Sequence, residues 1–598
     1  MAADASGPVD GPGSTESRLD SWKEIAAYLN RHVTTVRRWE KHEGLPVHRH
    51  VHDKLGSVYA FRAELDRWWH SRRVQLESQQ GDGCEPAPGE PLQAHRWLIL
   101  GGPVALCALI AIGYLMSPGW SIDSRPPAIT SLAVLPLDNL SNDAAQEYFA
   151  EGITEALIGQ LAKIGALRVV SRTSVMVFKG SRTPLPEIAR ALGVDAVVQG
   201  SVQRAGDRVR VSIRLIDGRS DAHLWARDFE RESKDILELQ AAVARAVGEE
   251  IRIQVTSNER GRMATAGSVN PAAYQEYLIG RYHLWRDNEE NLQRAIAHFE
   301  RATDIDPRYA AAYASLAHAW WKRGLWGQGE IGLEDAETPA RIAARKALEL
   351  DETLPDAYVV LADLERLYSR NLVRAEAWVT QALALHPRHV DAHYTYALLL
   401  MELGRFPEAI THMETAEELD PLSPAIQSDF GRVLYRARKF DEAILRLNRA
   451  LELEPEMGWL VYSRLAAVHE QMGQYDLALA ALQQAGGKGA PHTARLARVF
   501  ARMGDHGEAK RLLTLVEADP SRFAQSETAA VYVALGDRDK AFALLFDRLE
   551  RGDPGPNFIA VDPPFADLHS DPRWAELLRR MNVANRTHEG TRRPIRSQ

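Results

Sequence analysis

Cysteine is scarce in this chain, which has only Cys84 and Cys107 among its 598 residues. Two isolated thiols in different sequence surroundings exclude a disulfide framework and a cysteine-based zinc finger. The first 17 residues also lack a basic stretch followed by an apolar core, so they do not match a secretory signal. We expect residues 1–17 to form a disordered tail, because they are small, polar and rich in glycine, alanine and serine.

A strong excess of charge of one sign is also missing overall, but the charges are unevenly distributed. The formal net charge is −9, whereas residues 18–73 contain 12 Lys and Arg against 7 Asp and Glu. A basic head on an acidic remainder favours a polyanionic partner for the head. The chain is also too long for one hydrophobic core, so we expect several domains.

Residues 18–78 carry the pattern of two short helices joined by a tight turn. Ser21 and Glu24 have the spacing of a capping box, and apolar residues then recur on one helical face. We expect a second helix over 34–41, a hairpin or wing over 47–61, and a closing helix after it. The stretches SWKEIAAYL, TTVRRWE, GLPVHRH and GSVYAFRAELDRWW together resemble the winged helix-turn-helix of the MerR and excisionase group.

That resemblance implies contact with double-stranded DNA. Second-helix residues would face the major groove and wing residues would reach phosphates, namely Thr34, Thr35, Arg37, Arg38 and Lys41 on the helix and Arg49, His50, His52 and Lys54 on the wing. The alternative is that these residues form the solvated side of a small helical adaptor. The histidines could suggest a metal site, but no cysteines or second shell accompany them, so we predict neither a metal nor a cofactor.

A long uncharged run, WLILGGPVALCALIAIGYLM, occupies Trp97–Met116. About 20 residues at roughly 1.5 Å each span the ~30 Å hydrocarbon core of a bilayer. We therefore expect a linker at 79–95 and one transmembrane helix at 96–117, with a buried core helix as the alternative. The flanking charges favour a cytoplasmic N-terminus and a periplasmic C-terminal region in a bacterial inner membrane.

Residues 128–256 change to the pattern of a compact α/β domain. SLAVLPL suits a buried strand, and DAVVQGSVQRAG with RVRVSIRLIDG predicts a hairpin that turns near Gly206. The stretches LAVLPLDNLSND, EYFAEGITEALIGQL, VVSRTSVMVFKG, IARALGVDAVVQGSV and HLWARDF resemble the TolB amino-terminal-like, or FlgO-like, domain. We find no nucleophile–base pattern or phosphate loop, so we interpret its acidic residues as surface caps: Asp138, Asp143, Glu147, Glu151, Asp217 and Asp221.

From residue 270 onward the sequence repeats itself. GRFPEAITHMETAEELDP and RKFDEAILRLNRALELEP end 34 residues apart, and Ala375, Ala409 and Ala443 keep the same step. This period and residue pattern resemble the tetratricopeptide repeat, whose units must stack because none can bury its own apolar face. The expected order is a solenoid over 270–551, a capping segment over 552–584 and a disordered tail over 585–598.

The predicted fold class is therefore multidomain, with a small winged helix-turn-helix, one transmembrane helix, a compact α/β domain and an all-α tetratricopeptide-repeat solenoid. This order resembles the membrane-integrated one-component transcription regulators of the ToxR and CadC type. The resemblance implies double-stranded DNA at the head, a protein or peptide in the solenoid, a lipid bilayer around one helix, and a homodimer on the operator.

Two other functions fit parts of the sequence. A non-enzymatic, membrane-tethered envelope scaffold would use the head to bind protein instead of DNA. TolB-like and tetratricopeptide modules also accompany class III adenylate cyclases, which need a catalytic domain with paired metal-binding aspartates. Every long segment is already assigned to another module, so we predict that the chain is not an enzyme.

Overall fold

The computed structural model describes single residues and short stretches between 18 and 68, and most of the chain from 129 onward. The described ranges after the head are 129–141, 143, 146–251, 269–286, 288–326, 333–487, 489–518, 522–550 and 557–581. The chain divides into two compact units, Met1–Asp123 and Ser124–Gln598, and each is described by itself.

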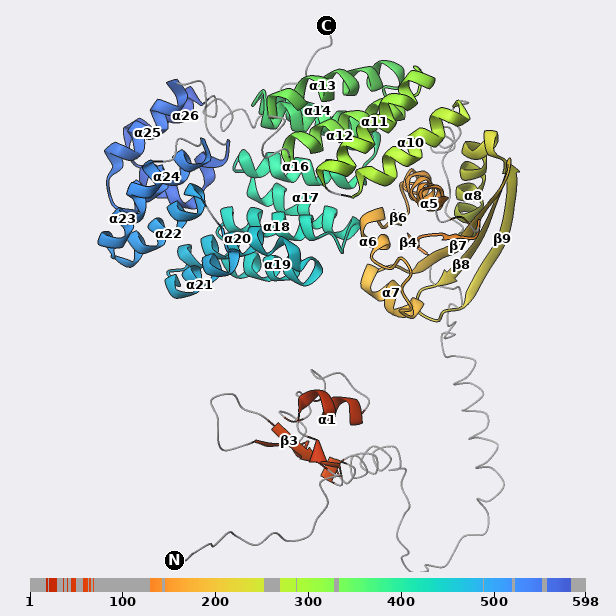
Figure 1. The fold of residues 1–598 in the computed structure, drawn as a ribbon, viewed down its shortest axis with the longest axis horizontal. Helices are drawn as coiled ribbons and strands as arrows, with labels where there is room; N and C mark the ends of the chain where they lie inside the picture. Colours follow the sequence, from red (N-terminus) through yellow and green to blue (C-terminus); the bar gives the residue numbers. More distant parts are fainter. Residues whose placement is uncertain are drawn as a thin grey trace, which may run out of the picture. The chain divides into compact units, whose positions relative to one another are not determined.

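The first unit contains a helix and a small antiparallel sheet (Figure 1). Strand β3 (Val58–Phe61) pairs on one side with β1 (Arg18–Leu19) and on the other with β2 (His48–Arg49), and α1 covers Trp22–Tyr28. The β2–β3 pairing is the hairpin predicted over 47–61. Apolar residues from β1, α1, β3 and the stretches between and after them form one core, made of Leu19, Ile25, Ala26, Val36, Leu45, Val58, Ala60 and Leu65. The second predicted helix, apart from Val36 and Glu40, lies outside the described residues.

The capping box predicted at the start of α1 is confirmed for the serine. The Ser21 hydroxyl accepts a hydrogen bond from the Glu24 backbone N–H at 3.2 Å. This bond satisfies one of the N–H groups that a helix leaves free in its first turn. The sequence signal therefore places the start of this helix correctly.

The transmembrane part of the expected fold class is wrong. No helix among the described residues is long and apolar enough to cross a bilayer. These helices bury one face and carry charges on the other; α13 (Leu333–Leu350), for example, includes Asp335, Arg341 and Lys346. Segment 97–116, on which the prediction depended, lies outside the described residues. The fold class is corrected to an all-α repeat region with a small mixed sheet, and the bilayer partner and inner-membrane location lose their support.

The second unit opens with a mixed sheet in the order β6-β4-β7-β8-β9, with β5 also paired to β7. The first strands run parallel and the last three form an antiparallel meander. The strands are β4 (Ser131–Val134), β5 (Asp138–Asn139), β6 (Arg168–Val169), β7 (Ala196–Ala205), β8 (Arg208–Asp217) and β9 (His223–Glu232). The helices are α5 (Glu147–Leu161), α6 (Arg172–Met176), α7 (Leu185–Leu192) and α8 (Ile236–Glu250), with the 3-10 turn η3 (Ser233–Asp235).

The hairpin predicted at Gly206 is confirmed, because β7 and β8 pair in register from Ala196↔Asp217 to Ala205↔Arg208. Gly206 has a φ of +59°, a conformation that a two-residue hairpin turn requires and that glycine adopts without strain. Alternate residues of β8 are buried, as expected for a strand with one face on the core.

Antiparallel helix pairs fill the rest of the second unit and follow one another from green to blue in Figure 1. The helices are α10 (Pro271–Leu284), α11 (Glu289–Ile305), α12 (Ala310–Trp326), α13, α14 (Pro355–Leu367), α15 (Leu372–Leu385), α16 (Val390–Glu402), α17 (Phe406–Leu419), α18 (Pro424–Arg436), α19 (Phe440–Leu453), α20 (Gly458–Gln471), α21 (Tyr475–Ala485), α22 (Ala490–Met503), α23 (His506–Glu517), α24 (Arg522–Ala534) and α25 (Arg538–Glu550). After them come the 3-10 turns η5 (Asn557–Val561) and η6 (Pro563–Leu568) and helix α26 (Pro572–Arg580); η4 (Pro455–Met457) precedes α20.

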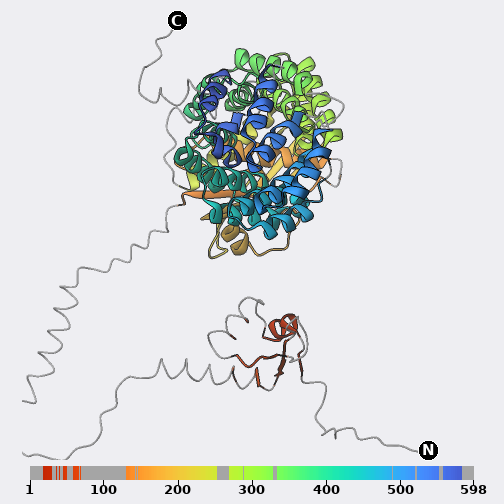
Figure 2. The same cartoon turned by 90° about the vertical axis from the view of Figure 1, so that its left-hand side faces the viewer.

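The first helices of successive pairs form the inner layer of this repeat region. They contact one another along the series, α12 with α14, α14 with α16, α16 with α18, and α22 with α24. In a curved stack of pairs, the layer in which neighbouring repeats approach most closely lies on the inside of the curve. Figure 2 shows the same stack from the side. We call the surface formed by these first helices the inner face.

The α/β domain touches the repeats at two separated places. Near the first pair, Leu278 of α10 belongs to the core of the α/β domain and packs against Gly152 of α5. Far along the chain, the Ser171 backbone N–H donates to the carbonyl of Leu419, the last residue of α17, at 2.9 Å. Leu422 joins the same core. The domain therefore spans the pairs from α10 to α17.

Candidate functional site

Eight of the nine residues predicted to contact DNA lie outside the described residues. They are Thr34, Thr35, Arg37, Arg38, Lys41, His50, His52 and Lys54. Arg49 is described only as part of strand β2. The proposed contacts of these nine residues therefore stay predictions.

His48 has a structural role in the head. Its ring lies 2.7 Å from the Glu64 carboxylate and stacks on Tyr59 with the ring centres 5.2 Å apart. The neighbouring Arg62 guanidinium lies 5.2 Å from the centre of the Tyr28 ring. These contacts tie the small sheet to α1 and to the residues after β3. Within the described residues, no group of three or more metal-ligating side chains comes together.

The acidic residues of the α/β domain have two different environments. Asp217 fits the predicted capping role, because its carboxylate accepts from the Ser220 hydroxyl and from the backbone N–H groups of Arg219 and Ser220. These hydrogen bonds, the hydroxyl first, keep its pKa below the ordinary value. Glu151 does not, because it is only 5% exposed and accepts from Arg172 at 2.6 Å and from Lys179 at 2.7 Å. The prediction of a surface cap at Glu151 is therefore wrong.

A buried carboxylate joins the α/β domain to the repeats. Asp420, just after α17, accepts a hydrogen bond from the Ser174 hydroxyl at 2.5 Å, and that hydroxyl also accepts from the Leu422 N–H at 2.8 Å. Burial raises the pKa of Asp420 to about 6, although the serine hydroxyls oppose that rise. Arg168 adds a hydrogen bond to the Glu418 carbonyl at 2.9 Å. This contact was not predicted, because some 250 residues separate its two sides in the sequence.

The inner face of the first pairs carries a cluster of titratable groups. His389 Nε2 lies 3.4 Å from Asp356 Oδ1, and this pairing raises the histidine pKa although burial opposes it. Burial lowers the pKa of His318 to about 3, and the nearby Lys322 and Arg281 charges lower it further. The cluster is mixed in sign and lies on α10, α12, α14 and the start of α16.

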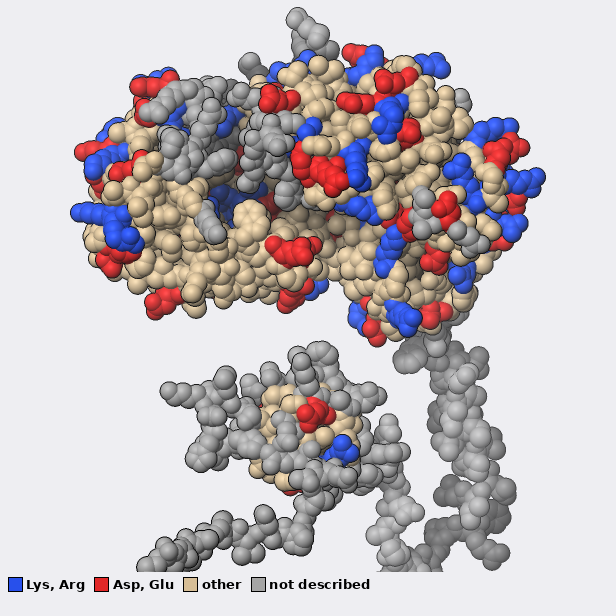
Figure 3. All heavy atoms as spheres, in the orientation of Figure 1, with Lys and Arg blue, Asp and Glu red and all other residues tan. Residues whose placement is uncertain are grey.

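The inner face of the later pairs carries a series of alternating charges that we call the charge ladder. Its members are Arg366, Glu402, Arg436, Glu470, Arg498 and Glu527, each on a first helix. Arg366 Nη1 is 2.7 Å from Glu402 Oε1, and Arg498 donates to both glutamates beside it at 2.9 and 2.7 Å. All but Glu527 are buried. Figure 3 shows part of this region as a hollow with basic side chains set back inside it.

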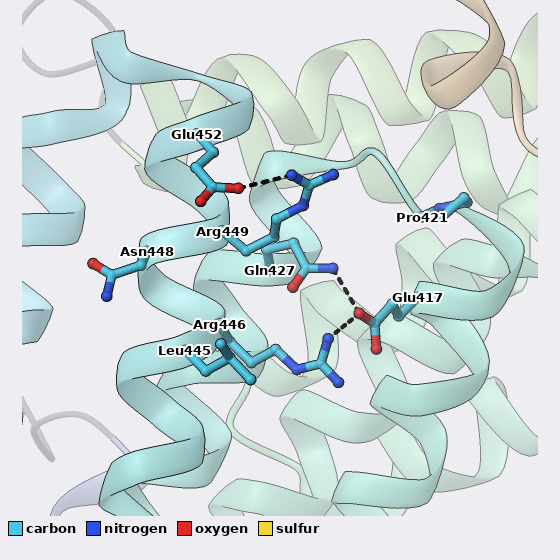
Figure 4. Close-up of a pocket in the computed structure, with 8 residues that line it drawn as sticks. All are labelled: Glu417, Pro421, Gln427, Leu445, Arg446, Asn448, Arg449 and Glu452. Carbon is cyan, nitrogen blue, oxygen red and sulfur yellow. Dashed lines mark hydrogen bonds and ion pairs between the residues drawn. The ribbon is translucent and has the colours of Figure 1, made fainter. Parts of the chain in front are cut away.

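A small polar pocket of about 270 Å³ lies on another side of the repeats, between α17, α18 and α19 (Figure 4). Gln427 is buried and donates to Glu417 at 2.9 Å, while its own carbonyl oxygen has no partner. Arg446 also pairs with Glu417, and Arg449 with Glu452 at 2.8 Å. Each charged side chain in the pocket is therefore already neutralised by a neighbour.

Family comparisons identify two parts of the chain. Residues 128–246 match the second domain of HilA/YgeH-like transcriptional regulators. Residues 366–428 and 428–491 match two tetratricopeptide-repeat families. The chain contains a HilA-like regulator domain and tetratricopeptide repeats. The repeat prediction is thus confirmed, whereas the MerR, TolB and ToxR/CadC resemblances stay predictions from the sequence.

Individual relatives match less than half of this chain. A Rhizobium meliloti (strain 1021) protein, named as a candidate adenylate cyclase 3, is 36% identical over 250 residues, 42% of each chain. The transcriptional regulator HilA of Salmonella typhimurium is 27% identical over 168 residues, 28% of this chain and 30% of HilA. The chain therefore spans less than half the length of these relatives. The solved structure of Pseudomonas aeruginosa PilF is 22% identical, covering 37% of this chain and 96% of PilF, with a TM-score of 0.29.

The prediction that the chain is not an enzyme is corrected by the first of these relatives. Its name refers to a catalytic activity, and it is similar to this chain over 250 residues. The prediction relied on every long segment having been assigned to another module. Assigning a module from its pattern describes its fold and does not exclude an activity.

Proposed function

We propose that this chain is a transcription regulator whose N-terminal head binds double-stranded DNA and whose tetratricopeptide repeats bind a protein partner. The observation that supports it best is the match of residues 128–246 to a domain of HilA/YgeH-like regulators. The basic head at 18–78 and the repeats then lie on either side of that domain in the sequence. Repeats of this kind support protein–protein interaction.

In this proposal the head binds DNA mainly through the phosphates. The predicted second-helix residues, with Arg37 and Arg38 at the centre, enter the major groove, where arginine can pair with guanine edges. The wing residues from Arg49 to Lys54 contact the backbone and set the orientation. Affinity then falls steeply as salt rises, because each neutralised phosphate releases counterions.

The test is binding of the full chain to genomic DNA fragments over a salt series. We expect sequence-selective binding, with Arg37→Ala/Arg38→Ala weakening it at least tenfold and reducing the salt slope by about one for each phosphate that is no longer neutralised. Arg579→Ala/Arg580→Ala is the matched control, because it removes the same charge from exposed positions of α26. Equal binding by both variants, or no binding by the wild type, would contradict the proposal and favour a head that binds protein.

A further inference from the structure

After the last helix pair, the chain returns to the inner face of the middle repeats. The turn η5 contacts α16, and the following turn η6 contacts α24. At the end of this stretch, Asp567 lies 3.3 Å from Arg502 of α22. Residues 557–568, which we call the return segment, therefore touch first helices that are far apart in the sequence.

The return segment makes a specific contact with Arg436, the last residue of α18. Asp562 Oδ1 lies 3.0 Å from Arg436 Nε, and the Phe558 ring centre lies 4.3 Å from the guanidinium carbon. Val561 packs beside Gly404, where an added Cβ would come within 3.4 Å of it. An aromatic side chain and a carboxylate four residues later thus both contact one buried guanidinium.

Arg436 is the member of the charge ladder without a carboxylate partner on the described repeats. Arg366 pairs with Glu402 on one side, and Arg498 pairs with Glu470 on the other. Of the described carboxylates, Asp562 is the one within ion-pair distance of Arg436. Removing the return segment would leave a buried guanidinium unpaired, a state that favours binding of another carboxylate.

The contact with Arg436 lies outside the hydrophobic core of α16 to α21. The apolar cluster formed by α16 to α21 includes no residue of the return segment. Ile559, Phe565 and Leu568 belong instead to the separate cluster of α22 to α26. The return segment is thus anchored in one apolar cluster and meets α16 and α18 through Arg436 and Gly404. Burial also raises the pKa of Asp562 despite the arginine, which shows incomplete compensation of its charge.

We propose that the return segment is an internal ligand that covers the inner face of α16 and α18, and that a protein partner must displace it. The partner offers an aromatic residue followed by a carboxylate about four positions later, as Phe558 and Asp562 do. This inference rests on the proposed protein-binding function of the repeats. It adds that their inner face is closed by the chain itself until a matching segment competes.

The test uses a fluorescent peptide with the sequence of residues 555–570 and the full chain. The return segment belongs to the same chain and therefore competes with the added peptide at a high effective concentration. The wild type should thus bind the peptide weakly. Phe558→Ala/Asp562→Asn should release the internal copy and increase peptide affinity at least tenfold. Asp567→Asn is the control, because it removes a carboxylate from the same segment at a half-exposed site and should bind like the wild type. A peptide with lysine in place of Asp562 should not bind the released chain.

Hydrogen exchange on the wild-type chain gives a second readout that needs no variant. We expect the amides of 560–562, which follow the anchored Ile559, to exchange through a local opening, faster than those of 565–568 and of α18. If the amides of the return segment and of α18 all exchange only through global unfolding, the inference is overturned. It is also overturned if the double variant binds the peptide no better than wild type. Neither result depends on the DNA-binding experiment. If the return segment is not an internal ligand, the proposal that the head binds DNA can therefore still be tested by itself.

Discussion

Asp420 is the buried carboxylate at the second contact between the α/β domain and the repeats, the one just after α17. It is 5% exposed, and the Ser174 hydroxyl donates to it within the contact. A carboxylate in such a place is more easily protonated than in water, because burial penalises its charged form. The strength of this contact therefore depends on pH.

The folded-state pKa of about 6 lies above the ordinary value of 3.8, which gives the sign of the effect. The proton contributes stability below pH 4, and this contribution is lost as pH rises through 6, by about 3 kcal/mol in total. We expect Asp420→Asn, which resembles the protonated form, to be more stable than wild type at pH 7 and similar to it near pH 4. Denaturation midpoints at several pH values measure this.

Asp306 provides the matched control for that measurement. It precedes Pro307 as Asp420 precedes Pro421, and it accepts from backbone N–H groups at a more open position. Asp306→Asn should leave the loss of stability between pH 4 and 7 in place. A wild-type midpoint that does not fall over this range would contradict the assignment to Asp420.

At the level of the elements, the turns between paired helices use the left-handed conformation. Gly404 and Gly473 have a φ of +72° after α16 and α20. The equivalent turn after α18 places Arg438 at +60°, where a side chain is strained. Arg438 is exposed and lies two residues before the start of α19, so its side chain contributes little packing there.

We expect Arg438→Gly to stabilise the protein by about 0.5–1 kcal/mol, since glycine adopts this conformation without the Cβ clash. A shift of the denaturation midpoint to higher denaturant measures the gain. Lys439→Gly is the control, because Lys439 has a φ of −92° and gains nothing from glycine. An equal or larger gain at residue 439 would show that the conformation of residue 438 is not the cause.

The elements also show which parts of the fold the sequence could predict. The repeats were predictable because Ala409 and Ala443, which keep the 34-residue step, are both fully buried at the close approach of two helices. The burial of Glu151 was not, since its partners Arg172 and Lys179 come from a separate segment. The charge ladder was missed for the same reason, because Arg366 meets Glu402 only after two pairs have stacked. The DNA contacts of the nine head residues stay predictions.

At the scale of the whole second unit, the α/β domain is attached to the repeats through close packing of α5 on α10. An added Cβ at Gly152 would lie 2.6 Å from a methyl carbon of the buried Leu278, whereas one at Gly159 of the same helix would meet nothing within 4 Å. A side chain at residue 152 would therefore force the buried Leu278 side chain to shift.

We expect Gly152→Val to destabilise the protein by about 1–3 kcal/mol through overpacking against Leu278. Gly159→Val makes the same chemical change on the same helix and should be neutral or slightly stabilising. Denaturation midpoints of both variants measure the difference. Equal effects would indicate helix propensity and not packing against α10 as the cause.

The two attachments of the α/β domain, at α10 and after α17, have a consequence for how the repeats unfold. A free stack of repeats can fray from its ends one pair at a time, because each pair contacts only its neighbours. The pairs from α10 to α17 are held at both ends by one folded body, so losing one of them strains or breaks an attachment. These pairs should therefore melt together with the sheet in a single cooperative step and not one pair at a time.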